Sequence, residues 1–176
     1  MKSKIVTFLL SLLLSGSNIW AQQSPVDLLF DKYSGKEGFT SVYISKYMFD
    51  LFSSIEADDP DAKEMQQAVS NLNSIRILSM DDPGKFPEIN FYNEIMKDLP
   101  ADTYKELMVV KEKNQNLKFL IREKENKISE LLLLIGGTDD NALISITGDI
   151  DLKTISKLSK SMNIEGLENL EKVEEK

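Results

Sequence analysis

Leu131-Leu132-Leu133-Leu134-Ile135 is an unbroken apolar run inside the segment 128–135. Successive side chains of a strand point to opposite faces, so a run that is apolar on both alternations indicates a central strand covered on both faces. Residues 117–122 alternate in the manner of a half-buried strand, and residues 142–147 alternate likewise in the last strand. These three segments predict the centre of a β-sheet.

Short connections link the strands of this second half. A further strand is predicted over 104–111, followed by a turn at 114–116. Glu125-Asn126 forms the next tight turn, and residues 136–141 form the loop before the last strand. Because short connections join neighbours, the four late strands are expected to form an antiparallel meander.

The first half of the chain alternates helical and strand-like segments. Helices are predicted where apolar residues recur at helical spacing, in the segments 26–33, 47–52, 60–72 and 91–99. Strands are predicted over 39–45 and 75–80. The first of these strands is β-branched and aromatic, and we expect it to be covered on both faces.

Helical character returns after the last strand. Asp151 can cap a helix whose buried stripe includes Leu152 and Ile155, and an acidic amphipathic run follows at 165–176. That run is either a partner-docking helix or a solvated helix that covers the sheet. The sequence therefore predicts an α+β fold: a single-domain sandwich with a mostly antiparallel sheet, made of the four-strand meander plus one or two earlier strands. Helices pack on this sheet, and the carboxyl terminus is helical.

The amino terminus has the three parts of a cleavable secretory signal. Lys2 and Lys4 precede an apolar run at 5–14, and Ala21 supplies the small residue before the cut. The run is about ten residues long, too short to span a bilayer, and it lacks the polar face of a buried amphipathic helix. We expect residues 1–21 to be removed. A single domain of residues 22–176 would remain, soluble in the periplasm or outside the cell and without a transmembrane segment.

The amino-acid composition excludes several kinds of catalytic and metal-binding site. The chain has no cysteine and no histidine, so it forms no disulfides and has no Ser-His-Asp triad, cysteine nucleophile or His/Cys zinc site. Loss of Lys2 and Lys4 with the signal moves the net charge from -8 to about -10. A field of that sign repels nucleic acid and anionic lipid, so neither is an expected partner.

The acidic residues that most resemble metal ligands flank the last predicted strand. Asp139 and Asp140 precede it, and Asp149 and Asp151 follow it, so each pair is a weak candidate for calcium. The two pairs lie at opposite ends of one strand and are not expected to converge. Turn and cap chemistry requires the same residues and is the favoured interpretation. No cofactor is expected, and no catalytic residue can be named.

These observations favour a non-enzymatic module that binds a protein or a small ligand. One alternative is a carboxylate-dependent enzyme or a calcium-dependent module that uses the acidic pairs. The other is an apolar-ligand carrier, because a groove could be lined by the aromatic side chains of Phe39, Tyr43, Phe49, Phe52, Phe86, Phe91 and Tyr92. At these spacings such residues are more often core residues.

Three runs carry a resemblance to a known family: Ser129–Gly137, Ile144–Leu152 and Asn163–Leu167. Together with the Lys-rich hairpin at 122–127, they resemble the domain of unknown function 4252 family of small exported bacterial proteins. The resemblance covers nearly the whole chain after the signal. It implies a Gram-negative envelope setting and hints at envelope signalling, but it carries no ligand or catalytic residue. Some relatives resemble lipoproteins, from which this chain departs because it has no cysteine.

Overall fold

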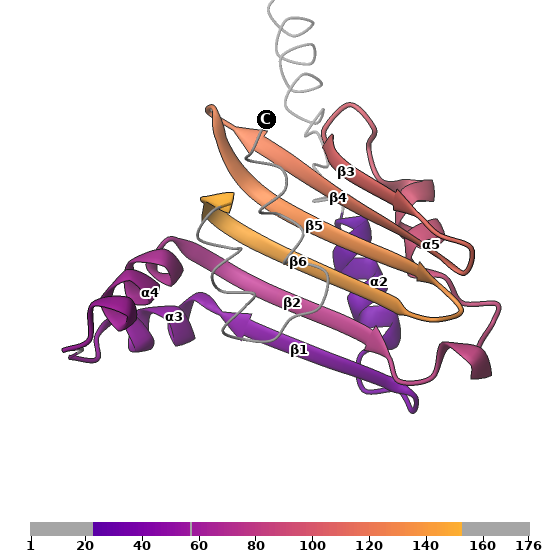
Figure 1. Ribbon diagram of the computed structural model, residues 1–176, viewed down its shortest axis with the longest axis horizontal. Helices are drawn as coiled ribbons and strands as arrows, with labels where there is room; N and C mark the ends of the chain where they lie inside the picture. The colour runs from indigo at the N-terminus through magenta and orange to yellow at the C-terminus, as the bar shows by residue number, and fades with distance from the viewer. Residues whose placement is uncertain (1–22, 57, 153–176) are drawn as a thin grey trace, which may run out of the picture.

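The computed structural model describes residues 23–56 and 58–152, which form one six-stranded antiparallel sheet with helices around it (Figure 1). The strands are β1 (Phe39–Ser45), β2 (Leu72–Met80), β3 (Lys105–Lys111), β4 (Gln115–Lys124), β5 (Lys127–Gly137) and β6 (Asn141–Ile150). The helices are α2 (Pro25–Tyr33), α3 (Lys46–Ser53), α4 (Pro60–Ser70) and α5 (Phe91–Asp98), with a 3₁₀ turn η1 (Pro83–Lys85). The expected α+β class and antiparallel sheet are confirmed.

The strand order is β1-β2-β6-β5-β4-β3, so the four late strands are sequential neighbours as predicted. Their tightest connection is the Glu125-Asn126 turn between β4 and β5. Both residues have positive φ, 55° and 62°, which is the backbone of a two-residue hairpin turn that matches the twist of the strands. β2 pairs with β6 and places β1 at the edge of the sheet.

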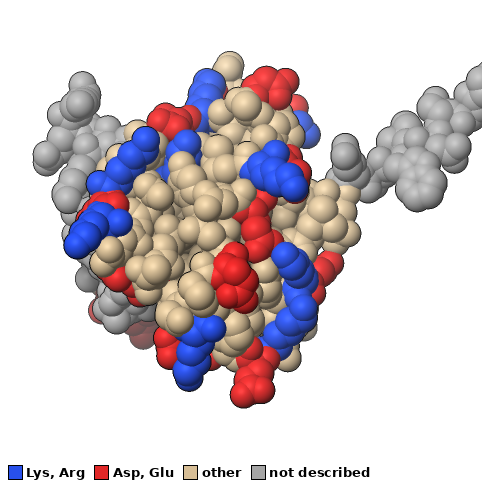
Figure 2. Space-filling model, turned by 90° about the vertical axis from the view of Figure 1, so that its right-hand side faces the viewer, with Lys and Arg blue, Asp and Glu red and all other residues tan. Residues whose placement is uncertain are grey.

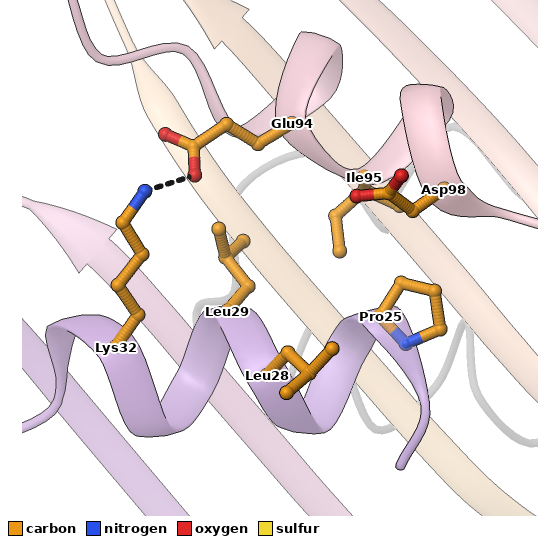
Figure 3. A pocket seen from close by; sticks show the side chains of 7 residues that line it. All are labelled: Pro25, Leu28, Leu29, Lys32, Glu94, Ile95 and Asp98. Carbon is orange, nitrogen blue, oxygen red and sulfur yellow. Dashed lines mark hydrogen bonds and ion pairs between the residues drawn. The ribbon is translucent and has the colours of Figure 1, made fainter. Parts of the chain in front are cut away.

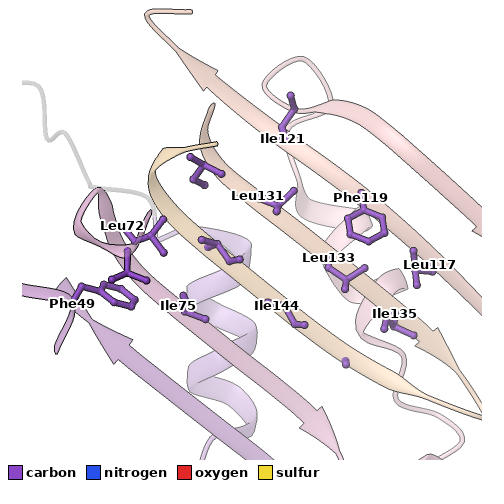
Figure 4. Packing of buried hydrophobic residues seen from close by; sticks show 14 residues of the cluster. Phe49, Leu72, Ile75, Leu117, Phe119, Ile121, Leu131, Leu133, Ile135 and Ile144 are labelled. Atoms are coloured by element: carbon purple, nitrogen blue, oxygen red, sulfur yellow. The ribbon is translucent and has the colours of Figure 1, made fainter. Parts of the chain in front are cut away.

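The centre of the sheet is buried on both sides. Leu131 to Ile135 are all at most 4% exposed, and alternate residues belong to two different apolar clusters. Leu132 and Leu134 lie on the face where α2 and α5 pack, behind the sheet in the view of Figure 1. Leu131 and Leu133 point to the opposite face, where they meet the side chains of the neighbouring strands (Figure 4). The predicted two-faced burial of β5 is therefore confirmed.

The expected two-faced cover of β1 is wrong. This strand has the predicted bounds, but Val42 is 38% exposed and Tyr43 is 57% exposed. The physical reason is its edge position: among the described strands only β2 pairs with it, so no strand covers its other side. Several boundaries also differ. The predicted loop at 136–141 is only 138–140, because β5 runs to Gly137 and β6 extends from Asn141 to Ile150, which places Asp149 inside β6. β2 begins at Leu72 rather than residue 75, and β4 begins at Gln115, inside the predicted turn.

The predicted signal and carboxyl-terminal helices lie outside the described residues. Within the described chain, no helix is long and apolar enough to cross a membrane.

Candidate functional site

The acidic pair at the β5–β6 loop forms local turn contacts. Asn114 Nδ2 donates to Asp139 Oδ1 at 3.2 Å, and the Asn141 backbone N–H donates to Asp140 Oδ1 at 2.7 Å. These contacts tie the loop to the β3–β4 turn and set the start of β6. Asp140 therefore bonds within its own turn, whereas Asp139 joins two neighbouring loops.

The second acidic pair lies at the far end of β6. Asp149 forms an ion pair with Lys127 of β5, and its backbone N–H donates to the Asn71 carbonyl at 2.9 Å. Hydrogen bonding to this carboxylate raises the pKa of Lys127. Asp151 follows the end of β6. Eight strand residues, 141–148, lie between Asp140 and Asp149, which corresponds to roughly 30 Å along the strand, so the structure does not bring the two pairs together. Among the residues described, no group of three or more acidic side chains is placed to hold a metal ion.

A buried carboxylate that the sequence reasoning missed is Glu130, on the helix-bearing face of β5. It is 5% exposed. It accepts hydrogen bonds from Arg122 Nη2 at 2.8 Å, the Tyr104 hydroxyl at 2.8 Å and Ser145 Oγ at 3.3 Å. Burial and the adjacent Glu130 carboxylate raise the pKa of Tyr104.

These donors come from β4, from the residue before β3 and from β6, so the carboxylate joins four consecutive chain segments. Both of its oxygens are occupied, which suits a structural ion better than a general acid or base. A sequence signal was present. Glu130 shares its alternation with buried Leu132 and Leu134, and β4 places Arg122 directly opposite.

A shallow groove separates α2 from α5 (Figure 3). Lys32 Nζ lies 2.6 Å from Glu94 Oε2 across it, and the Tyr33 hydroxyl donates to Glu94 Oε1 at 2.7 Å. Hydrogen bonding to Glu94 raises the pKa of Lys32. The groove has a volume of about 200 Å³, below the roughly 300 Å³ at which small-molecule pockets begin. It therefore offers little to a small apolar ligand.

Exposed large hydrophobic side chains gather at the β1 edge of the sheet and along α3, and we call this region the β1–α3 surface. It consists of Tyr47, Met48, Leu51, Phe52 and Ile55, on α3 and the turn after it, together with Val42 and Tyr43, which are consecutive in β1 and therefore lie on the two opposite faces of this edge strand. These are seven of the eight large hydrophobic side chains that are exposed within the described chain. Tyr47 is 71% exposed and Ile55 61% exposed. Neighbouring exposed apolar side chains mark interaction sites more often than scattered single ones do.

The β1–α3 surface is held in place from below. Phe49, on the inner side of α3, is 6% exposed and joins the core. Gln66 of α4 donates from Nε2 to the carbonyls of Phe52 at 3.0 Å and Ile55 at 2.7 Å. Helix α3 therefore presents its other apolar side chains outward because Phe49 and α4 fix its rotation. The sequence predicted the helix but not this exposure.

Away from the β1–α3 surface, basic and acidic side chains are mixed. On the end of the molecule drawn in Figure 2, basic and acidic side chains are interspersed with uncharged surface between them. Four of the described ion pairs lie on the β4–β5 half of the sheet, and they join Lys105 to Glu123, Lys118 to Glu106, Arg122 to Glu130 and Lys127 to Asp149. Such a distribution provides no concentrated basic patch of the kind that binds nucleic acid.

Comparison with known protein families places this chain in context. A family described as Domain of unknown function (DUF4252) matches residues 33–158, which is more than half of the chain and includes β1, α3 and all later strands. No curated protein and no solved structure matches.

Proposed function

The chain belongs to the DUF4252 family, and on that premise we propose that it is an exported, non-enzymatic binding module of the bacterial envelope. Its interface is the β1–α3 surface. The observation that carries this proposal is the gathering of seven exposed apolar side chains on one edge strand and the helix that follows it.

The composition of the surface fits a protein partner. It has two tyrosines, one phenylalanine and one methionine, which are residue types enriched in the cores of protein interfaces. Its only described ion pair is Lys46–Asp50, at 3.0 Å on one side of α3. The surface is the outside of a helix and a strand rather than a pocket, so a macromolecule fits it better than a small ligand.

Export is supported by the sequence. The basic, apolar and small-residue parts of residues 1–21 have the order of a cleavable signal. The same proposal includes the single-domain sandwich of residues 22–176, with a helical carboxyl terminus. The apolar spacing of Leu152, Ile155 and Leu158 supports that helix, as does the burial of Leu131 and Leu133 on the face opposite α2 and α5. Envelope signalling remains an inference from the family resemblance.

Site-specific photo-crosslinking in the native host tests the proposal. A photoreactive phenylalanine analogue at Tyr47 should give a defined protein adduct. The same analogue at Leu28, which is 52% exposed on α2, should not. The double variant Tyr47→Ser, Leu51→Ser should keep its melting temperature, because both side chains are exposed, and a probe at Phe52 in that background should lose the adduct. Absence of any adduct from Tyr47 would refute the proposed interface.

A further inference from the structure

The two edges of the sheet differ in how they are protected. Edge strand β3 carries Lys105, Glu106 and Lys111, and its pairing with β4 shifts register between Glu106 and Met108. Charges and bulges of this kind prevent an edge from pairing with another chain. Edge strand β1 reads Phe-Thr-Ser-Val-Tyr-Ile-Ser, without charge or proline. Its seven pairs with β2 run without a register shift, unlike the other four strand pairings of the sheet.

The outer side of β1 has backbone groups suited to pairing. The Asp81 N–H donates to the Gly38 carbonyl at 3.0 Å, and these residues continue the β1–β2 register. Hydrogen bonding alternates along an antiparallel pair. Thr40, Val42 and Ile44 therefore bond toward β2, whereas Ser41 and Tyr43 direct their N–H and C=O groups away from the sheet. Within the described chain, no strand lies on that side.

The sequence of β1 is complementary to itself. An antiparallel register centred on Val42 overlaps all seven residues and places Ser41 opposite Tyr43 of a second copy, as hydrogen-bonded pairs. Val42 then faces its own symmetry mate, and Thr40 faces Ile44. β-Branched side chains, which suit a pleated strand, meet on one face, and on the other face each aromatic side chain lies opposite a serine small enough to leave it room. No like charges come together.

Charge also favours a second copy over a charged peptide. The chain carries a net charge of -8, so two copies repel each other in most orientations. Because β1 itself carries no charge, repulsion between two copies is weakest where their β1 edges meet. The β1 edge offers no acidic side chain to attract a basic peptide. The adjoining apolar side chains of α3 extend the contact beyond the strand.

We propose that two copies of this chain pair antiparallel through β1, joining their sheets into one of twelve strands, with the exposed side chains of α3 flanking the junction. This inference rests on the proposed function, because it names the partner of the β1–α3 surface. A twofold contact uses the same patch on both copies. The protected β3 edge then stops the assembly at two.

Mass measurement gives the first test. Light scattering or sedimentation of the purified, naturally processed protein should give twice the monomer mass at concentrations on the order of 10–100 µM, a range in which a contact of micromolar Kd is mostly formed. Val42→Lys places two ammonium groups across the axis and should return the protein to monomer. Leu28→Lys adds the same charge on α2 and should remain dimeric. Both variants should keep a cooperative melt, because both positions are exposed.

Cysteine substitution tests the register, because the chain has no cysteine of its own. In the proposed pair the two Val42 Cα atoms face each other at about 4.5 Å, within disulfide reach. Val42→Cys should therefore form a disulfide-linked dimer under mild oxidation. Thr40→Cys, whose symmetry mate lies about 13 Å away along the strand, should form at least tenfold less.

Each outcome decides between the proposals. A monomeric mass at every concentration, or equal crosslinking at positions 40 and 42, overturns the β1 dimer. If the Tyr47 photo-adduct then contains a different protein, the β1–α3 interface stands and only its partner changes. If Tyr47 gives no adduct and the protein is monomeric, both proposals fail.

Discussion

Arg122 Nη2 lies 2.8 Å from Glu130 Oε2, and the Glu130 side chain is 6% exposed while that of Arg122 is 44% exposed. The guanidinium therefore reaches from solvent to neutralise a carboxylate that the sheet buries. A buried charge that loses its partner is destabilising because it cannot recover its hydration.

Arg122→Ala is expected to lower the free energy of unfolding by about 2 kcal/mol, the scale for a buried group left without a partner. Lys105→Ala breaks the Lys105–Glu123 pair, whose side chains are 66% and 36% exposed. This change should lower the free energy of unfolding by less than about 1 kcal/mol. Urea unfolding at pH 7 measures both. Equal losses would show that the burial of Glu130 does not decide the strength of its ion pair.

The raised pKa of Tyr104 leads us to expect a loss of protein stability at alkaline pH. Its pKa is raised in the folded state by burial, then by the Glu130 carboxylate, so the folded protein holds the phenolic proton more tightly than the unfolded chain does. This contribution is complete below the unfolded tyrosine pKa of about 10 and is lost as pH rises above it.

Tyr104→Phe should therefore have a shallower fall in stability between about pH 10 and 11.5 than the parent. Urea unfolding across that range measures the slopes, and absorbance near 295 nm should show one late-ionising tyrosine missing from the variant. Tyr47→Phe is the control, because its ring is 71% exposed. Parallel slopes for Tyr104→Phe and the parent would contradict the assigned role of the phenol.

Leu132 and Leu133 face opposite sides of β5 and are 0% and 1% exposed. Replacing either with Asp should abolish folding, since an unpaired buried charge costs several kcal/mol against a total stability of about 5–15 kcal/mol. Leu28→Asp, at an exposed site on α2, should fold. Circular dichroism during heating distinguishes these cases. A normal melt for Leu133→Asp would mean that the face opposite α2 and α5 is solvated.

The sequence predicted best what is locally determined. The unbroken apolar run at 131–135 can only be satisfied by cover on two faces, and Glu125-Asn126 accepts the positive φ that a two-residue turn requires. The position of β1 was not predictable in this way. It depends on β2 pairing with β6 from the far end of the chain, and apolar side chains look the same in sequence whether or not a neighbour covers them.

In the candidate site too, contacts within one turn could be predicted from the sequence, and contacts between distant segments could not. Asp140 accepts from the next residue along the chain, so its turn role could be predicted from the sequence, whereas the contact of Asp139 with Asn114 joins two loops 25 residues apart and could not. The partners of Glu130 could not be named before the register of β4 placed Arg122 opposite it and the fold brought the Ser145 hydroxyl within hydrogen-bonding distance. The exposure of Tyr47 depends on the rotation of α3, which Phe49 and Gln66 set through tertiary contacts.

The processed protein is expected to begin at Gln22, because Ala21 is the small residue that ends the signal-like segment. Mass spectrometry of the protein recovered from its host should show the loss of residues 1–21. Changing Ala21 to a bulky residue should slow processing. An intact Met1, or an acylated amino terminus, would contradict export by this route.

Calcium should not bind specifically at the acidic loops. Asp139 accepts from Asn114, Asp140 accepts from the Asn141 backbone, and Asp149 pairs with Lys127, so these three carboxylates already have partners. A calcium site in the folded state alone would add about 2.7 kcal/mol of stability at a hundred times its Kd, which raises the melting temperature of a chain this size by several degrees.

Melting curves with chelator, calcium or magnesium at matched ionic strength separate a site from charge screening. Screening of a surface with a net charge of -8 responds to both ions alike, so we expect small and equal shifts. A calcium-selective rise that disappears when Asp139 and Asp140 are changed to Asn would establish a site at the β5–β6 loop. The same rise lost instead in Asp149→Asn would place the site at the other end of β6, where binding would have to displace Lys127. In either case the calcium-dependent alternative would become the better account of the protein.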